Sequence, residues 1–93
     1  MLKITSIKIV SPNKIICTFS NSSIRIFDLL LVDFSSDMKN KILKDENILK
    51  AKIGVFGEIY WKDFGSLRDF DGKIIKCNYD FSPEFVFDNS KPI

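Results

Sequence analysis

The residues that come closest to a catalytic or metal-binding pattern are aspartates in the last third of the chain. Asp63-Phe64-Gly65 spells the metal-binding triplet of protein kinases, but neither a glycine-rich loop nor a catalytic-loop motif accompanies it. Four aspartates could gather around a divalent cation: Asp63, Asp69, Asp71 and Asp80. They lack the spacing of a calcium loop and are expected to line a solvated turn. We therefore expect no metal site.

Histidine, the commonest general base in enzymes and a frequent metal ligand, is absent from the chain. Serine and cysteine triads and His-ligated zinc sites are therefore excluded in their common forms. Cys17 and Cys77 match no zinc-binding spacing and are expected to be free thiols. Together these observations predict a protein that is not an enzyme and that holds no cofactor.

Length and composition predict one domain with an ordinary core. The chain has 93 residues, of which 45% are hydrophobic, and a chain of this size folds without metal or disulfide support. It has no apolar run long enough to span a membrane, and its first residues do not resemble a secretory signal. We expect a cytoplasmic protein without membrane contact.

The balance of charge gives only a weak signal for nucleic acid. Fourteen Lys and Arg against twelve Asp and Glu leave a net charge of +2, far below that of a dedicated nucleic-acid module. One local excess of lysines stands out: Lys39, Lys41, Lys44, Lys50 and Lys52. A solvated helical face is one interpretation of this cluster, and a phosphate-binding patch is the other.

Aromatic side chains concentrate toward the end of the chain and are candidates for partner binding. Core packing would use most of them, but one short helical turn cannot bury all of its aromatic residues, so some are expected to form an exposed patch. Acidic neighbours argue against a stacking platform for nucleic acid. The candidate partner-binding residues are Tyr79, Phe81, Phe85, Phe87, Phe64 and Phe70.

Hydrophobic periodicity predicts three antiparallel strands in the N-terminal third. Apolar residues alternate with their neighbours over residues 7–9, 15–19 and 24–27, and clusters of turn-forming residues separate these segments. The alternation is out of phase before this region. A β-bulge is therefore expected near Thr5 and Ser6.

The middle of the chain changes to a helical period. Apolar residues are widely spaced over 36–49, where Ser36 or Asp37 is expected to cap one helix and Asp45 a second short one. The resulting broken helical segment is expected to lie on the sheet. Residues 50–61 alternate again and predict a second hairpin.

Two short sequence motifs complete the prediction, whose fold class is α+β. Asp71-Gly72 is a tight-turn dipeptide, and Ser82-Pro83-Glu84 combines an N-cap, a first-turn proline and an acidic residue, which predicts one terminal helical turn. The prediction is a single domain over residues 1–93. It contains a small antiparallel sheet of three N-terminal strands, a broken helical segment, a second hairpin and the terminal turn.

The order of these segments resembles the bacterial domain-of-unknown-function family 2442. The residues that carry the resemblance are Phe19-Ser20-Asn21, Phe27-Asp28-Leu29, Leu43-Lys44-Asp45, Ile59-Tyr60-Trp61 and the segment 80–87. The resemblance implies a small α+β domain. Some members of the family are followed by a helix-turn-helix DNA-binding domain, and others stand near small genes that look like toxin and antitoxin pairs. The family has no agreed catalytic residues to transfer.

The chain departs from the common pattern of that family by an insertion loop at residues 63–76, and we expect no DNA binding of the helix-turn-helix kind found in some members. The leading hypothesis is a non-enzymatic interaction module, a regulator or antitoxin-like subunit that binds a partner protein. The alternative is a nucleic-acid-associated protein that uses the lysine cluster. Pairing of exposed strand edges in a homodimer is also left open.

Overall fold

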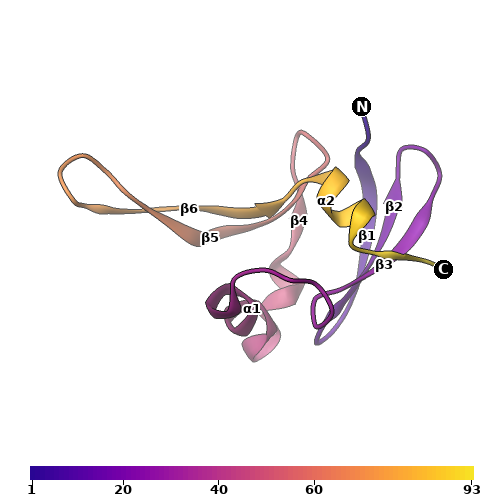
Figure 1. Cartoon of the computed structure of the whole chain (residues 1–93), viewed down its shortest axis with the longest axis horizontal. Coiled ribbons are helices and arrows are strands. Elements are labelled where there is room, and N and C mark those ends of the chain that lie inside the picture. Colours follow the sequence, from indigo (N-terminus) through magenta and orange to yellow (C-terminus); the bar gives the residue numbers. More distant parts are fainter.

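The computed structural model describes all residues from 1 to 93, and it confirms the predicted α+β fold class. Two antiparallel sheets stand side by side, with helical segments packed between and across them (Figure 1). No helix of the structure has both the length and the apolar composition needed to span a membrane. The elements in chain order are β1 (Ile4–Val10), β2 (Lys14–Phe19), β3 (Ile24–Asp28), α1 (Ser36–Leu43), η1 (Lys44–Lys50), β4 (Lys52–Ile53), β5 (Ile59–Arg68), β6 (Ile74–Phe81), α2 (Pro83–Asp88) and β7 (Lys91–Pro92).

The first sheet contains the three predicted N-terminal strands in the order β1-β2-β3-β7. Its buried face follows the alternation of β2, where Ile15, Cys17 and Phe19 are all almost fully buried. The pairing of β1 with β2 shifts register between Ile4 and Ser6, which confirms the predicted bulge. Strand β7 was not predicted, because two residues at the end of a chain carry no periodicity.

The second sheet has the order β4-β5-β6, and its β5–β6 hairpin is the longest feature of the molecule. The predicted pairing within residues 50–61 is present as β4 with β5. Residues 63–76, expected as an insertion loop, instead form most of the hairpin's outer half. The turn residues explain this, because the Asp69 carboxylate accepts hydrogen bonds from the N–H groups of Asp71 and Lys73 and so closes the tip.

The helical middle differs from its prediction at both caps. The N-cap of α1 is Ser35, whose hydroxyl accepts from the Met38 N–H, rather than Ser36 or Asp37. Asp45 caps nothing: Asp45 and Glu46 have φ angles of 53° and 57°, so the chain kinks there between two helical pieces. Acidic residues at such a kink are easily mistaken for a cap, because Asp favours both situations.

The terminal helix α2 begins as predicted. Ser82 is its N-cap, Pro83 occupies the first turn, and the Ser82 hydroxyl accepts from the Phe85 N–H at 3.1 Å. Arg25 then ties the segment after α2 to β3, because its Nε donates to the Ser90 hydroxyl at 2.7 Å and its guanidinium lies 4.4 Å from the centre of the Phe87 ring. These contacts hold the chain end against the first sheet.

One core joins the two sheets and the helices. Fourteen buried hydrophobic residues form a single cluster that draws on β1, β2, β3, α1, η1, β5, β6 and α2. Trp61 and Phe81 lie where the second sheet meets the body, with ring centres 5.8 Å apart. Beyond Phe64 and Tyr79 no residue of the hairpin belongs to or packs against the cluster. The outer hairpin projects from the body (Figure 1), and the molecule measures 45 × 29 × 20 Å along its principal axes.

Candidate functional site

The projecting part of the hairpin, residues 65–77, is called the arm here. Its two strands keep a strict two-residue alternation, so each face has its own character. On one face, Gly65 lies opposite Cys77 and Leu67 lies opposite Ile75. On the other, polar and charged side chains predominate: Ser66, Lys76 and Arg68, with Ile74 opposite Arg68. The arm therefore has the pattern of a half-buried strand pair.

The apolar face of the arm continues the core face of the same sheet. Strand β6 is regular, so Cys77 lies on the same side as Tyr79 and the buried Phe81. At the bulge, three residues separate Trp61 from Gly65 on β5, whereas one residue separates their partners Tyr79 and Cys77 on β6. The two extra residues are an even number, so the alternation of faces is preserved. The core face thus extends into the arm, where nothing covers it.

Four large hydrophobic side chains of the arm are exposed to solvent. The exposed fractions are 63% for Leu67, 110% for Phe70, 68% for Ile74 and 49% for Ile75. Clustered exposed apolar residues of this kind mark interaction sites more often than isolated ones do. Sequence reasoning identified only Phe70 among the four. The alternation of residues 65–68 and 74–77 around the Asp71-Gly72 turn was the signal that could have found the others.

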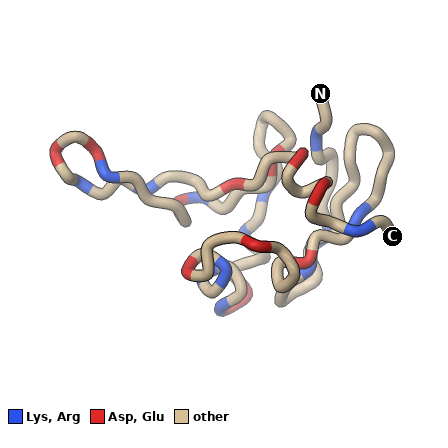
Figure 2. Tube along the Cα trace, in the orientation of Figure 1, with Lys and Arg blue, Asp and Glu red and all other residues tan.

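Charges on the arm are mixed in sign. Arg68, Lys73 and Lys76 stand against Asp69 and Asp71, and Figure 2 shows the two colours interleaved along the arm and its tip. A surface that follows a phosphate backbone needs a consistent positive stripe. The arm lacks such a stripe.

Of the six aromatic candidates for partner binding, Phe81 is corrected to a core residue. It is only 5% exposed, and its ring stacks on Phe85 at 5.3 Å and meets Phe27 edge-on at 5.4 Å. It is buried because β6 ends against α2 and β3, which close over the strand end. A side chain in this position has no surface to offer a partner.

The other terminal aromatics are half-buried and pack against the core: Tyr79, Phe85 and Phe87. Phe87 meets Phe19 edge-on at 5.1 Å, while Phe85 stacks on Phe81 as described above. The six-residue helix α2 lies flat on the body, so that most of its apolar side chains reach the core. The expectation that a short turn must leave an exposed aromatic patch is therefore not fulfilled at this end of the chain.

Phe64 and Phe70 differ in how far they are buried. Phe64 is half-buried at the root of the arm, where the ammonium groups of Lys41 and Lys50 lie 4.5 and 5.9 Å from its ring centre. Phe70 stands at the tip and contacts no part of the core. Of the six predicted residues, Phe70 is fully exposed, whereas Phe64, Tyr79, Phe85 and Phe87 are half-buried and Phe81 is buried.

The five candidate lysines do not share one helical face. Lys39 and Lys41 belong to α1, Lys44 and Lys50 to η1 beyond the kink, and Lys52 to β4. Lys39 donates to the Val32 carbonyl at 2.7 Å. Lys41 donates to the Phe64 carbonyl at 3.3 Å. Two of the five ammonium groups are therefore engaged with the protein's own backbone.

The two cysteines occupy contrasting environments. Cys17 is buried in β2, and burial raises the pKa of its thiol from 9.0 to about 12. Cys77 is half-buried on the apolar face of the arm, and both are free thiols. No three Cys, Asp or Glu side chains come together in a way that could hold a metal ion, so the four candidate aspartates do not form a cluster.

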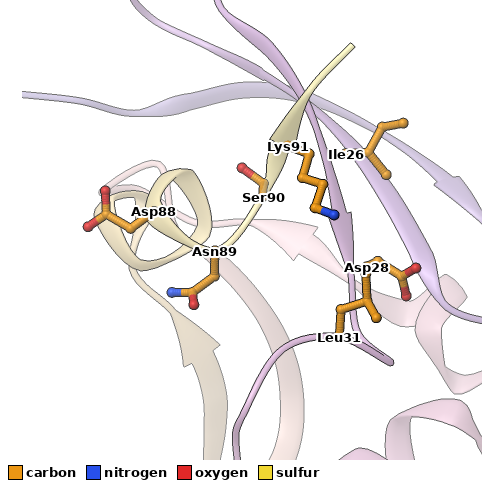
Figure 3. Close-up of a pocket in the computed structure, with 7 residues that line it drawn as sticks. All are labelled: Ile26, Asp28, Leu31, Asp88, Asn89, Ser90 and Lys91. Carbon is orange, nitrogen blue, oxygen red and sulfur yellow. The ribbon is translucent and has the colours of Figure 1, made fainter.

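A hollow of about 350 Å³ lies between β3 and the chain end, and Figure 3 shows its lining. Asp88 points away from Lys91 and Asp28 in this view, so the charged groups do not converge on one ligand position. Specific small-molecule sites need convergent polar groups in an apolar enclosure. The lining residues are Ile26, Asp28, Leu31, Asp88, Asn89, Ser90 and Lys91.

Comparison of the chain with protein-family models, with curated proteins and with solved structures finds no match in any of the three. The resemblance to family 2442 therefore stays a prediction from the sequence. The arm is one region of the surface where exposed apolar side chains gather, and such regions are candidates for binding.

Proposed function

We propose that this protein is a non-enzymatic interaction module that binds a partner protein with the apolar face and tip of its arm. The observation that carries the proposal is the uncovered apolar alternation of the arm, which ends in the fully exposed Phe70. A regulator or antitoxin-like subunit is the specific role that we propose within this class.

Exposed apolar side chains on an ordered strand pair favour tight protein contacts for two reasons. Burial of a large aliphatic or aromatic side chain contributes about 1.5 to 3 kcal/mol, and the apolar face and tip of the arm offer three of them, Leu67, Phe70 and Ile75. The strands already hold these side chains in place, so binding orders little additional chain. Phe70 and Leu67 have the positions of anchor residues, which typically carry most of the binding energy at an interface.

A nucleic-acid partner is the weaker proposal. Its candidate lysines are divided among α1, η1 and β4, and the arm itself carries both signs of charge. A complex driven by phosphates would weaken steeply as salt rises, whereas an apolar contact would not. Salt dependence therefore separates the two proposals directly.

The test is capture of partners from native cells by two tagged forms of the protein. The arm variant combines Leu67→Ser, Phe70→Ser and Ile75→Ser, all at exposed or half-exposed positions outside the core. We expect wild-type protein to retain one partner after nuclease treatment and at high salt, and the arm variant to lose it. Quantitative mass spectrometry of the captured proteins gives the comparison.

A matched control uses another pair of strongly exposed hydrophobic residues. Val55 and Phe56 occupy the turn between β4 and β5 and are 83% and 67% exposed. Val55→Ser combined with Phe56→Ser should leave capture unchanged, because the arm is intact. Loss of the partner from this control alone, or retention by the arm variant, contradicts the proposal.

A further inference from the structure

The edges of the two sheets are protected unequally. One edge of each sheet is a two-residue strand: β7 in the first, which contains Pro92, and β4 in the second. Short edges and proline are the usual protection against pairing with another chain. The opposite edges, β1 and β6, are long. Strand β6 spans Ile74–Phe81, and β5 is its only strand neighbour.

Strand β1 is less suited than β6 to pair with a strand of another chain. Its first residue is already engaged, because the Ile4 N–H donates to the Gly57 carbonyl. Lys8 is its only charged side chain, so it has no acidic group to oppose a lysine from a second copy. Strand β6 carries one charge of each sign, Lys76 and Asp80, and can therefore attract its own copy.

The spacing of these two charges defines a register for self-pairing. Residues that lie opposite each other in an antiparallel pair point to the same face of the sheet. When two identical strands pair around a two-fold axis, one residue therefore lies opposite the same residue of the second copy, and the axis passes between these two residues. With the axis at Asn78, Lys76 lies opposite Asp80 of the second copy, and Asp80 lies opposite Lys76 of the second copy. An axis at Lys76 would instead place like charges opposite each other.

The side chain at the axis is already directed away from the free edge. Asn78 Oδ1 accepts a hydrogen bond from the Asp63 N–H of β5 at 3.3 Å, which holds the amide over the hairpin. Two such side chains can therefore meet at the axis without competing for the same space. In this register Cys77 lies opposite Tyr79 of the second copy, so apolar face meets apolar face.

We infer that two copies of this chain associate through antiparallel pairing of their β6 edges, centred on Asn78. The product is one continuous sheet with three strands from each copy, and the apolar faces of both arms lie on the same side of it. The inference is independent of the proposed partner. It is tested on purified protein, so its failure and the failure of the proposed function are distinguishable.

The first test is the solution mass of the purified protein and of charge variants. Wild-type protein should approach twice its 10.7 kDa mass as concentration rises. Lys76→Glu and Asp80→Lys each turn two attractive pairs into repulsive ones by symmetry, and each should weaken dimerisation by roughly tenfold or more. Measurement by sedimentation equilibrium at low salt shows the largest difference.

Mixing the two single variants gives the sharper result. In a mixed dimer, Glu at position 76 faces Lys at position 80, and Asp80 faces Lys76, so all charges are matched. The mixture should therefore dimerise although neither variant does so alone, and the double variant should dimerise by itself. A wild-type protein that stays monomeric at all concentrations, or a mixture that stays monomeric, overturns the inference.

Disulfide trapping tests which residues of the two β6 strands lie opposite each other. In a Cys77→Ser background, Asn78→Cys should form a covalent dimer under mild oxidation, because position 78 faces itself across the axis. Lys76→Cys in the same background is the matched control and should not cross-link. Cross-linking at position 76 in place of 78, or through Cys77 of the wild-type protein alone, would overturn this register.

Discussion

The base and the tip of the β5–β6 hairpin have the same strand geometry but differ in burial. At the base, Ile59 lies opposite Phe81 and Trp61 opposite Tyr79, and all but Tyr79 are buried almost completely. In the arm, Leu67 lies opposite Ile75 with the same strand geometry, and both are largely exposed. The pattern of apolar residues is continuous, but the layer that covers it stops at Phe64 and Tyr79.

This difference shows that alternation and burial are separate properties of a strand pair. Alternation arises from the chain itself, whereas burial needs α1, η1 and the first sheet to lie over the base. The same apolar side chains therefore stabilise the fold at one end and are available for binding at the other. Substitutions at matched positions should separate the two roles.

Phe81→Ala, at the base, should have the largest effect on stability. It removes a buried ring that contacts Phe27, Trp61 and Phe85, and such truncations cost about 3 to 5 kcal/mol. That is a large part of the free energy of unfolding of a small domain. Urea unfolding followed by the fluorescence of Trp61 measures the loss. A cost below about 1 kcal/mol would contradict the assignment of Phe81 to the core.

Two glycines with positive φ allow a matched comparison of body and arm. Gly57 has φ 76°, and a Cβ there would lie 2.7 Å from Cα of Lys3, whereas Gly72 has φ 79° and open space around it. Gly72→Ala should therefore cost only the backbone strain, about 1 kcal/mol. Gly57→Ala should cost clearly more because the backbone must also move. Equal losses in urea unfolding would show that the arm turn is as constrained as the body.

Alkaline pH should destabilise the protein through the buried thiol of Cys17. Below pH 9 the Cys17 thiol keeps its proton in both states. Above pH 9 only the unfolded state ionises, since burial holds the folded pKa at about 12. Stability should thus fall between pH 9 and about 12, by at most about 1.4 kcal/mol per pH unit. Cys17→Ala should remove the part of this decrease in stability that comes from Cys17, whereas Cys77→Ala should leave that part in place.

Phe70→Ala should have the smallest effect on stability and a clear effect on binding. The side chain is fully exposed at the tip, so its loss should change the free energy of unfolding by less than about 0.5 kcal/mol. Capture of the proposed partner should nevertheless decrease, because an anchor residue is removed. A large stability loss with unchanged capture would reverse the roles assigned to base and tip.

The sequence predicted those parts of the fold that local chemistry determines. The three N-terminal strands, the bulge after Ile4 and the Ser82 cap of α2 follow from alternation, phase and capping preference. The break in the helical segment was predicted, but the left-handed conformation of Asp45 and Glu46 was not, because such residues look like a helix cap in sequence. The strand β7 depends on the distant contact of Ser90 with Arg25, which no local pattern records.

The candidate site was predicted less well than the fold. Phe81 and Phe70 are both phenylalanines beside strand segments, and only tertiary packing makes one a core residue and the other a free tip. Residues 63–76 were expected as a loop because they form an insertion relative to the resembled family and contain the turn signals Gly65 and Asp71-Gly72, and the structure has a bulge at Asp63, with φ 60°. Asp63 and Gly65 occupy two successive positions where the alternation after Ile59 and Trp61 would need apolar residues, so the period count ends before Leu67.

Removal of the arm tests the central claim most directly. Replacing residues 66–76 with Asn-Gly joins Gly65 to Cys77, which already lie opposite each other and suit a two-residue hairpin turn. Unfolding free energy and partner capture are then measured on the same shortened protein. We predict that stability changes by no more than about 1 kcal/mol, because the arm lies outside the core, and that the partner is lost. A shortened protein that unfolds, or one that still captures the partner, would contradict the assignment of the arm to binding.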